Sequence, residues 1–148
     1  MSKQTEPSFA TTLHVRDTCM CLHVQRTARA LARRFDEALK PFGLTNQQFS
    51  LLMSLNRPAP PRMKEVASLL ALDRTTLTAN LKVLERRGLV NSTSDPKDRR
   101  SRLLLLTDAG RERLAAALPA WAQTEAEVEA LLKFGTADEV RADLEAMS

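Results

Sequence analysis

Residues 74–107, RTTLTANLKVLERRGLVNSTSDPKDRRSRLLLLT, decide the fold. They begin with a helical pattern whose leucines form one narrow apolar stripe, and Gly88 ends that pattern as a C-terminal glycine. Two alternating segments follow, LVNSTS (89–94) and SRLLLLT (101–107), and both are typical of β-strands. The loop between them is strongly basic, at a hairpin tip where no core can use the charge. This placement suggests that the partner of these cations lies outside the protein.

A second helix precedes this segment at close range. The stretch MKEVASLLAL predicts a short helix over 64–70, and Asp73 is a good N-cap for the helix over 74–87. Two helices joined by a tight turn and followed by a hairpin are the outline of a winged helix-turn-helix. In such a module the second helix enters the major groove of DNA, and a basic hairpin reaches the neighbouring minor groove. We therefore expect a mainly α protein with a small β-hairpin wing.

The flanking segments complete a prediction of six helices. A helical pattern over 13–39 precedes the module and is longer than the core of so small a domain requires, which indicates packing against a second copy of the chain. The next helix begins at a capping box formed by Thr45 and Gln48. A fifth helix runs from Thr107 through a kink at Pro119 to Leu131 and Leu132, and a sixth begins at a second capping box, Thr136 with Glu139.

Composition limits the class of protein. The chain has 148 residues, 27% of them charged, and a formal net charge of +4, which suits one globular domain with a polyanionic partner. The cations concentrate between Arg74 and Arg102, whereas acids dominate after Pro119. No apolar run approaches the roughly 20 residues of a membrane span, and no catalytic motif or metal-ligand motif occurs. We expect a cytoplasmic protein that is not an enzyme and has no cofactor and no metal.

The segment LALDRTTLTANLKVLERRGLVNSTSDPKDRRSRLLLLTDAGRERL resembles the MarR family of bacterial transcription regulators. The resemblance is carried by the D-R-T-T-x-T helix start, the L-E-R-R-G-L-V exit, the D-P-x-D-R-R wing and the L-T-x-x-G opening of the next helix. It implies a homodimer joined through its N- and C-terminal helices that binds a pseudo-palindromic operator as a repressor. It divides the chain into a disordered tail (1–9), dimerisation helices (10–42 and 108–148) and a DNA-binding lobe (43–107). A small phenolic or aromatic ligand, or oxidation, would modulate binding.

The same resemblance assigns the DNA contacts. Asp98 would hold the Arg100 guanidinium by a charge-assisted bond while Arg100 enters the minor groove. The remaining contacts fall on the second helix and on the rest of the wing: Arg74, Thr75, Thr76, Thr78, Asn80, Lys82, Lys97, Arg99 and Arg102. Many family members have an apolar residue where Asn80 stands, so Asn80 either reaches an adenine edge or fills a packing defect.

A candidate effector or redox site lies in HVRDTCMCLH and just beyond it. Within one helix Cys19 and His23 would share a face, whereas Cys21 would point about 200° away from Cys19, which argues against convergent metal ligands and against a disulfide within the chain. Three interpretations remain: two small apolar residues, a thiol-based redox sensor that uses Cys19 or Cys21, and a metal site. Arg16, His23 and Arg26 are cations that could meet an aromatic carboxylate, or form ordinary surface charges.

Overall fold

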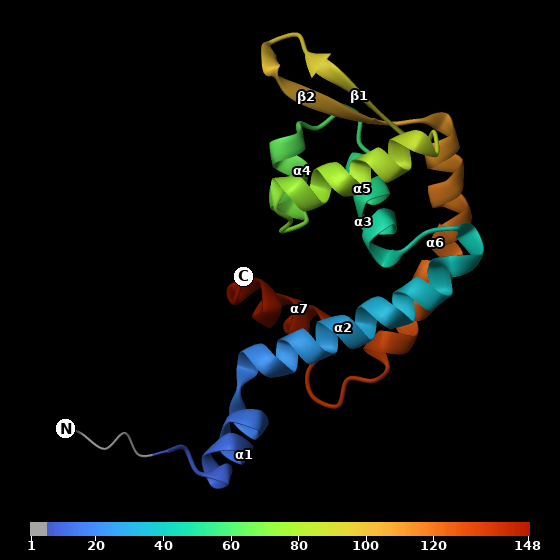
Figure 1. Cartoon of the computed structure of the whole chain (residues 1–148). Helices are drawn as coiled ribbons and strands as arrows, with labels where there is room; N and C mark the ends of the chain where they lie inside the picture. The colour runs from blue at the N-terminus through green and yellow to red at the C-terminus, as the bar shows by residue number, and fades with distance from the viewer. Residues whose placement is uncertain (1–5) are drawn as a thin grey trace, which may run out of the picture.

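The computed structural model describes residues 6–148, which form seven α-helices, one short 3₁₀ helix and a two-stranded antiparallel hairpin (Figure 1). In chain order the elements are α1 (Phe9–Thr18), α2 (Met20–Leu39), η1 (Lys40–Phe42), α3 (Asn46–Leu55), α4 (Met63–Leu69), α5 (Arg74–Arg86), β1 (Val90–Asp95), β2 (Asp98–Leu106), α6 (Asp108–Glu129) and α7 (Ala137–Ala146). The mainly α fold with a hairpin wing is confirmed. Of the tail expected at 1–9, residues 1–5 lie outside the described part, and α1 begins at Phe9.

The additional helix arises because the first predicted helix is broken at Cys19. The backbone of Cys19 is extended (φ −68°, ψ 107°), its N–H donates to Val15 at 2.9 Å, and its Sγ accepts from the N–H of Leu22 at 3.4 Å. One residue thus ends α1 and caps α2. The expectation of one continuous helix over 13–39 was wrong because its apolar spacing came from the second part, where Phe35 and Leu39 are buried, whereas α1 buries nothing within the chain.

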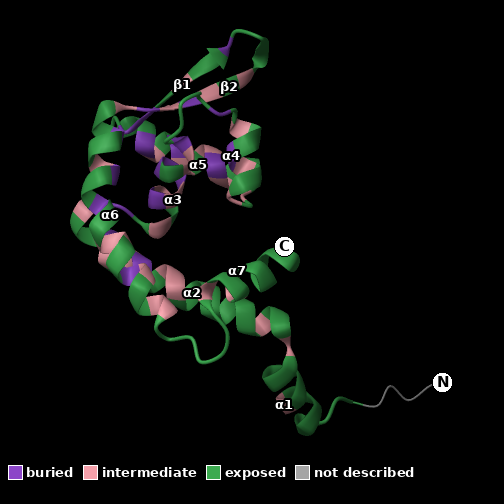
Figure 2. Ribbon diagram, turned by 180° about the vertical axis from the view of Figure 1, so that it is seen from behind, coloured by how far each residue is buried: buried purple, intermediate pink, exposed green. Residues whose placement is uncertain are grey.

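The winged lobe (43–107) holds most of the core. Residues from α3, α4, α5 and both strands are buried together, as the purple segments in Figure 2 show. The predicted capping box of α3 is present, with Thr45 and Gln48 each accepting from the other's backbone N–H, and Leu44 and Phe49 are buried on either side of it. These local signals fix the start of α3, and packing of its apolar face against the core stabilises the rest of the helix.

The hairpin is longer at its tip than predicted. Its register runs from Val90 opposite Leu106 to Asp95 opposite Asp98, so the connection is only Pro96 and Lys97. The strand expected to begin at residue 101 begins at Asp98 because the Lys97 N–H donates to Oδ1 of Asp95 at 2.9 Å and closes a tight turn. Two arginines expected in a loop therefore lie on β2.

Helix α6 connects the lobe to the remaining helices. It contains Pro119 without ending there and changes direction near its middle (Figure 2). It ends at Glu129, so Leu131 and Leu132 lie beyond it, contrary to the expectation. Its first turn packs closely against Leu89, just after α5. The approach is so close that a Cβ at Gly110 would overlap the carbonyl oxygen of Leu89.

The last helix is capped as predicted but buries no residue. Thr136 and Glu139 form the expected capping box at the start of α7. Along the described chain, no helix combines the length and the apolar character that a membrane crossing needs.

Candidate nucleic-acid interface

Helix α5 presents a polar face to solvent because its apolar stripe is turned into the core. Leu77, Leu81 and Leu84 are buried, and the opposite side exposes Thr75 and Lys82. These two predicted contact residues are therefore free to meet a ligand outside the chain. An exposed helix face edged by a hydroxyl and an ammonium group suits the donors and acceptors of a DNA groove.

The first turn of α5 is held by its N-cap. The Asp73 carboxylate accepts from the Thr76 backbone N–H at 2.8 Å and from the Thr76 hydroxyl at 2.7 Å, and these hydrogen bonds lower the pKa of Asp73 below its ordinary 3.8. The Thr78 hydroxyl donates to the carbonyl oxygen of Arg74 at 2.7 Å. Two of the three predicted threonine hydroxyls thus already have partners within the helix.

Asn80 lies at the edge of the buried stripe rather than on the exposed face. Its side-chain Nδ2 is buried and has no hydrogen-bond partner in the structure. A buried amide without a partner costs free energy. This position fits the packing interpretation of Asn80 better than contact with a base.

The wing carries its cations in the open. Lys97, Arg99, Arg100 and Arg102 are all exposed, and the Arg102 guanidinium donates to the Ser92 hydroxyl at 2.7 Å. Within residues 6–148, no carboxylate forms an ion pair with any of these four or with Arg74 or Lys82. Their charge is therefore not neutralised by a direct ion pair within the described part of the chain.

Asp98 acts differently from the expectation. Its Oδ1 accepts from the backbone N–H of Arg100 at 3.1 Å and its Oδ2 from the Ser101 hydroxyl at 3.1 Å, while no ion pair joins it to the Arg100 guanidinium. Asp98 thus shapes the backbone at the start of β2 and leaves the Arg100 side chain free. The guanidinium bond predicted from the family pattern is absent here because the carboxylate is already engaged locally.

Sequence reasoning missed a second acid in the wing. Asp95 is 4% exposed and pairs with Arg62, Nε to Oδ2 at 2.9 Å, across 33 positions of sequence. Its pKa is lowered chiefly by the hydrogen bond from the Lys97 N–H and further by the charge of Arg62. No periodicity links residues so far apart. An acid beside a proline in a basic loop could nevertheless have suggested that Asp95 has a structural role.

A hollow of about 300 Å³ unites these elements between α4, the start of α5 and β2. It brings the predicted residues Arg74, Arg100 and Arg102 together and adds two cations that sequence reasoning did not assign, Arg62 and Lys64. Its lining is Arg62, Met63, Lys64, Ala67, Arg74, Arg100, Ser101 and Arg102. A concave surface with five cations is suited to phosphate oxygens.

The candidate effector residues lie on α1 and α2, away from this surface (Figure 1). Arg16 pairs with Asp17 at 2.6 Å, and His23 Nδ1 lies 2.8 Å from the carbonyl oxygen of Cys19. His23 and Arg26 line a shallow basic hollow on α2, whereas Cys21 is exposed. Because Cys19 is outside the helical repeat, the helical argument that separated its thiol from that of Cys21 no longer applies.

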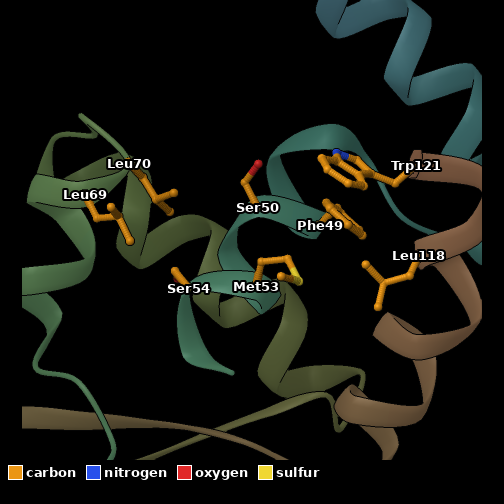
Figure 3. A pocket seen from close by; sticks show the side chains of 8 residues that line it. All are labelled: Phe49, Ser50, Met53, Ser54, Leu69, Leu70, Leu118 and Trp121. Atoms are coloured by element: carbon orange, nitrogen blue, oxygen red, sulfur yellow. The ribbon is translucent and has the colours of Figure 1, made fainter. Parts of the chain in front are cut away.

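An apolar pocket of about 370 Å³ was not predicted from the sequence (Figure 3). Phe49 and Trp121 stack on one side with ring centroids 6.0 Å apart. Met53, Leu69 and Leu118 are more than a third exposed although they line it. No charged side chain lines it, and its polar side chains are two serines and the indole of Trp121: its lining is Phe49, Ser50, Met53, Ser54, Leu69, Leu70, Leu118 and Trp121.

The model of the MarR family matches residues 44–101. The DNA complex of the transcriptional regulator MosR from M. tuberculosis is 40% identical with a TM-score of 0.79, covering 87% of this chain and 92% of that chain. The transcriptional repressor CouR, bound to a 23-mer DNA duplex, is 30% identical with a TM-score of 0.73. The match covers 97% of this chain and 96% of the CouR chain.

Among curated sequences, the uncharacterized HTH-type transcriptional regulator YwoH from Bacillus subtilis is 36% identical over 84 residues. That match covers 57% of this chain and 61% of YwoH, so the chain spans less than two thirds of this relative's length.

Proposed function

This chain belongs to the MarR family of DNA-binding transcription regulators, and on that premise we propose that it acts as a homodimeric repressor of a pseudo-palindromic operator. In this proposal the exposed face of α5 enters the major groove and Arg100 of the wing enters the adjacent minor groove. Arg74, Lys97, Arg99 and Arg102 neutralise phosphates. Thr75 and Lys82 contact base edges or phosphates from the middle of α5.

The observation that carries the proposal is one continuous basic surface whose cations are almost all without a direct ion pair. The exposed side of α5, the five-cation hollow and the wing adjoin one another, and among residues 6–148 only Arg62 of their cations is paired with a carboxylate. Such a concentration of free charge costs stability through self-repulsion unless a polyanion neutralises it. Duplex DNA is such a polyanion.

The argument for a dimer rests on helices whose apolar residues stay exposed in the single chain. Helices α1 and α7 bury no residue within the chain, and they and the turn after α6 expose Phe9, Leu131, Phe134 and Leu144. A second copy of the chain is the occupant that the family resemblance implies, with residues 10–42 and 108–148 forming the interface around the two lobes (43–107).

The test compares two cations of equal charge. We expect Arg100→Ala to weaken DNA binding by about 1–3 kcal/mol, whereas Arg57→Ala, in the loop between α3 and α4, leaves it unchanged. Arg57 is exposed, does not line the five-cation hollow and lies outside the proposed dimer segments. It is a better control than Arg141, which pairs with Glu125, Glu129 and Asp138. The measurement is fluorescence anisotropy with a duplex selected by the wild-type protein from a random pool. Equal losses in both variants would contradict the wing assignment.

Salt dependence and footprint give an independent check. If a dimer neutralises roughly 6–10 phosphates, its affinity should fall by roughly 10³–10⁵ between about 50 and 200 mM salt. Two-fold symmetry predicts protected half-sites about 10 base pairs apart, or a multiple of that distance.

For the effector, the apolar pocket of Figure 3 favours a small aromatic ligand. The stacked Phe49 and Trp121 and the absence of a charged side chain in the lining suit the ring of such a ligand rather than its carboxylate. CouR has been crystallised with p-coumaroyl-CoA, a ligand with an aromatic part. Quenching of Trp121, the only tryptophan, by a panel of phenolic acids and their neutral analogues tests this.

Thiol oxidation is the alternative control. The break at Cys19 frees its thiol from the helical geometry, and Cys21 beside it is exposed. Peroxide would then oxidise the thiol of Cys19 or Cys21 to a sulfenic acid and be reduced to water. Loss of DNA binding on peroxide treatment that Cys19→Ser or Cys21→Ser prevents would support this alternative; equal loss in both variants would exclude it.

A further inference from the structure

We propose that Arg62 is a positioning residue whose ion pair with Asp95 holds the wing at the angle from which Arg100 reaches the minor groove. The inference rests on the proposed function, because it concerns how the same surface is kept in shape. Arg62 acts here through Asp95 rather than by contacting DNA.

The first observation is where the wing is buried. Its root is anchored by Val90, Leu104 and Leu106, which lie in the core. Toward the tip, the strand residues are exposed or half-buried until Asp95, which is buried again. The outer half of the wing therefore has no apolar anchor, and Asp95 is the residue that ties it down.

The second observation is what Asp95 is tied to. Its Oδ2 accepts from Nε of Arg62 at 2.9 Å, and its Oδ1 accepts from the Lys97 N–H that closes the turn. A buried carboxylate requires both a counter-charge and hydrogen bonds, and this one has both. The same side chain thus links the tip of the wing to the N-cap residue of α4.

The third observation is that the backbone of residues 61 and 62 is fixed. The carbonyl oxygen of Pro61, a fully buried residue, accepts from the Leu104 N–H at 2.9 Å, and Arg62 forms a β-bridge with Leu103. The Arg62 N–H donates to Glu65 at 3.0 Å within α4. Arg62 therefore contacts both strands of the wing, and its own backbone is held in place by these hydrogen bonds.

The consequence concerns the distance between the two reading elements. Arg62 and Arg100 line the same hollow as Arg74 at the start of α5. Fixing the wing tip to α4 fixes where Arg100 stands relative to the recognition helix, and preorganised contacts bind more tightly than mobile ones. Without the tether, the outer wing pivots on its root and Arg100 loses a defined position.

The competing explanation is a direct phosphate contact, since the Arg62 side chain is 46% exposed in a basic hollow. A double-mutant cycle separates the two. We expect Arg62→Gln to weaken binding by about tenfold and to have no effect when Arg100→Ala is already present, because the positioned group is then missing. Additive losses would overturn the inference. Lys64→Gln is the matched control, a cation of the same hollow without an ion pair, and its loss should add to that of Arg100→Ala.

Asp95→Asn provides a second test with opposite outcomes. Removal of a negative charge beside DNA should strengthen binding if Arg62 contacts phosphate, but should weaken it if the ion pair sets the position of the wing. Thermal unfolding of each variant, followed by circular dichroism, verifies that the lobe stays folded. Arg62→Lys, which keeps the charge, should retain part of the affinity.

The same experiments distinguish this inference from the proposed function. If Arg100→Ala alone leaves affinity unchanged, Arg100 does not contact DNA, and both the wing assignment of the proposed function and this inference are overturned. If Arg100→Ala weakens binding but the cycle is additive, or if Asp95→Asn binds more tightly, only the positioning role of Arg62 is overturned.

Discussion

The winged lobe and the terminal helices satisfy their apolar residues in opposite ways. Most of the lobe's large apolar side chains are buried within one chain, whereas α1 and α7 bury none, as the contrast between purple and green in Figure 2 shows. The lobe buries its apolar residues within the chain, in a core that also includes Phe35 and Leu39 of α2 and Leu114 and Ala117 of α6. In the proposed dimer, the exposed apolar residues of α1 and α7 would be covered by the second copy. On that proposal, folding of the lobe and assembly of the dimer should respond to different substitutions.

The largest expected effect is on the lobe core. Leu77→Ala removes a fully buried side chain of α5 and should lower the free energy of unfolding by about 2–5 kcal/mol, from lost burial and the cavity left behind. Urea denaturation followed by circular dichroism measures it. Leu69→Ala removes the same atoms from a side chain that is 69% exposed and should change it by less than about 0.5 kcal/mol. Similar losses would remove the contrast between core and surface.

Acidification should act next, also on the lobe. Asp73 and Asp95 have folded-state pKa values below their ordinary 3.8, so their ionised forms stabilise the native state. That stabilisation is fully present above the ordinary pKa and is lost as the pH falls through the lowered values. The urea midpoint should therefore hold steady down to about pH 5 and then drop. A combined Asp73→Asn and Asp95→Asn variant should show a flatter acid branch, and an unchanged branch would contradict the assignment.

A smaller effect, of the opposite sign, is expected at Asn80. Asn80→Leu removes the buried Nδ2 that has no partner and should raise the free energy of unfolding by about 1 kcal/mol. Asn80→Asp, which places a charge at the same site, should lower it. The same denaturation assay applies, with DNA affinity measured in parallel. Loss of sequence preference in Asn80→Leu would restore the adenine contact as the role of this residue.

The smallest effect on the lobe is expected from the terminal helices. Leu144→Ala shortens an exposed side chain of α7 and should leave the unfolding of the lobe unchanged within about 0.5 kcal/mol. It should instead weaken self-association, measured by sedimentation equilibrium, because its side chain is to be buried by a second copy. A loss of lobe stability like that of Leu77→Ala, with unchanged association, would show that the two regions are not independent.

The parts that the sequence predicted well were those governed by local rules. The capping boxes at Thr45 and Thr136, the N-cap at Asp73 and the stripe of α5 depend on neighbours within four residues. Composition and the wing motif then identified the basic surface. Lys82 and the wing cations are exposed in the structure as their type and position suggested.

The parts that were missed depend on contacts distant in sequence or on weak local preferences. Arg62 could not be assigned because its partner lies 33 positions away. The break at Cys19 was missed because a cysteine is an uncommon N-cap and no proline or glycine marks it. The Asp98 hydrogen bonds replaced the expected pairing with the Arg100 guanidinium, because a backbone N–H two residues away was nearer.

The absence of a side chain at Gly110 bears on the distance between the two α5 helices in the proposed dimer. Helix α6 leaves the lobe at the point where its first turn rests on the carbonyl of Leu89, and no side chain fits between them. Since α6 runs from the lobe toward the terminal helices, a side chain inserted at this joint would change the angle between the lobe and α6. In the proposed dimer, the distance between the two α5 helices, and with it the operator geometry accepted, would thus be controlled partly by a residue that touches no DNA.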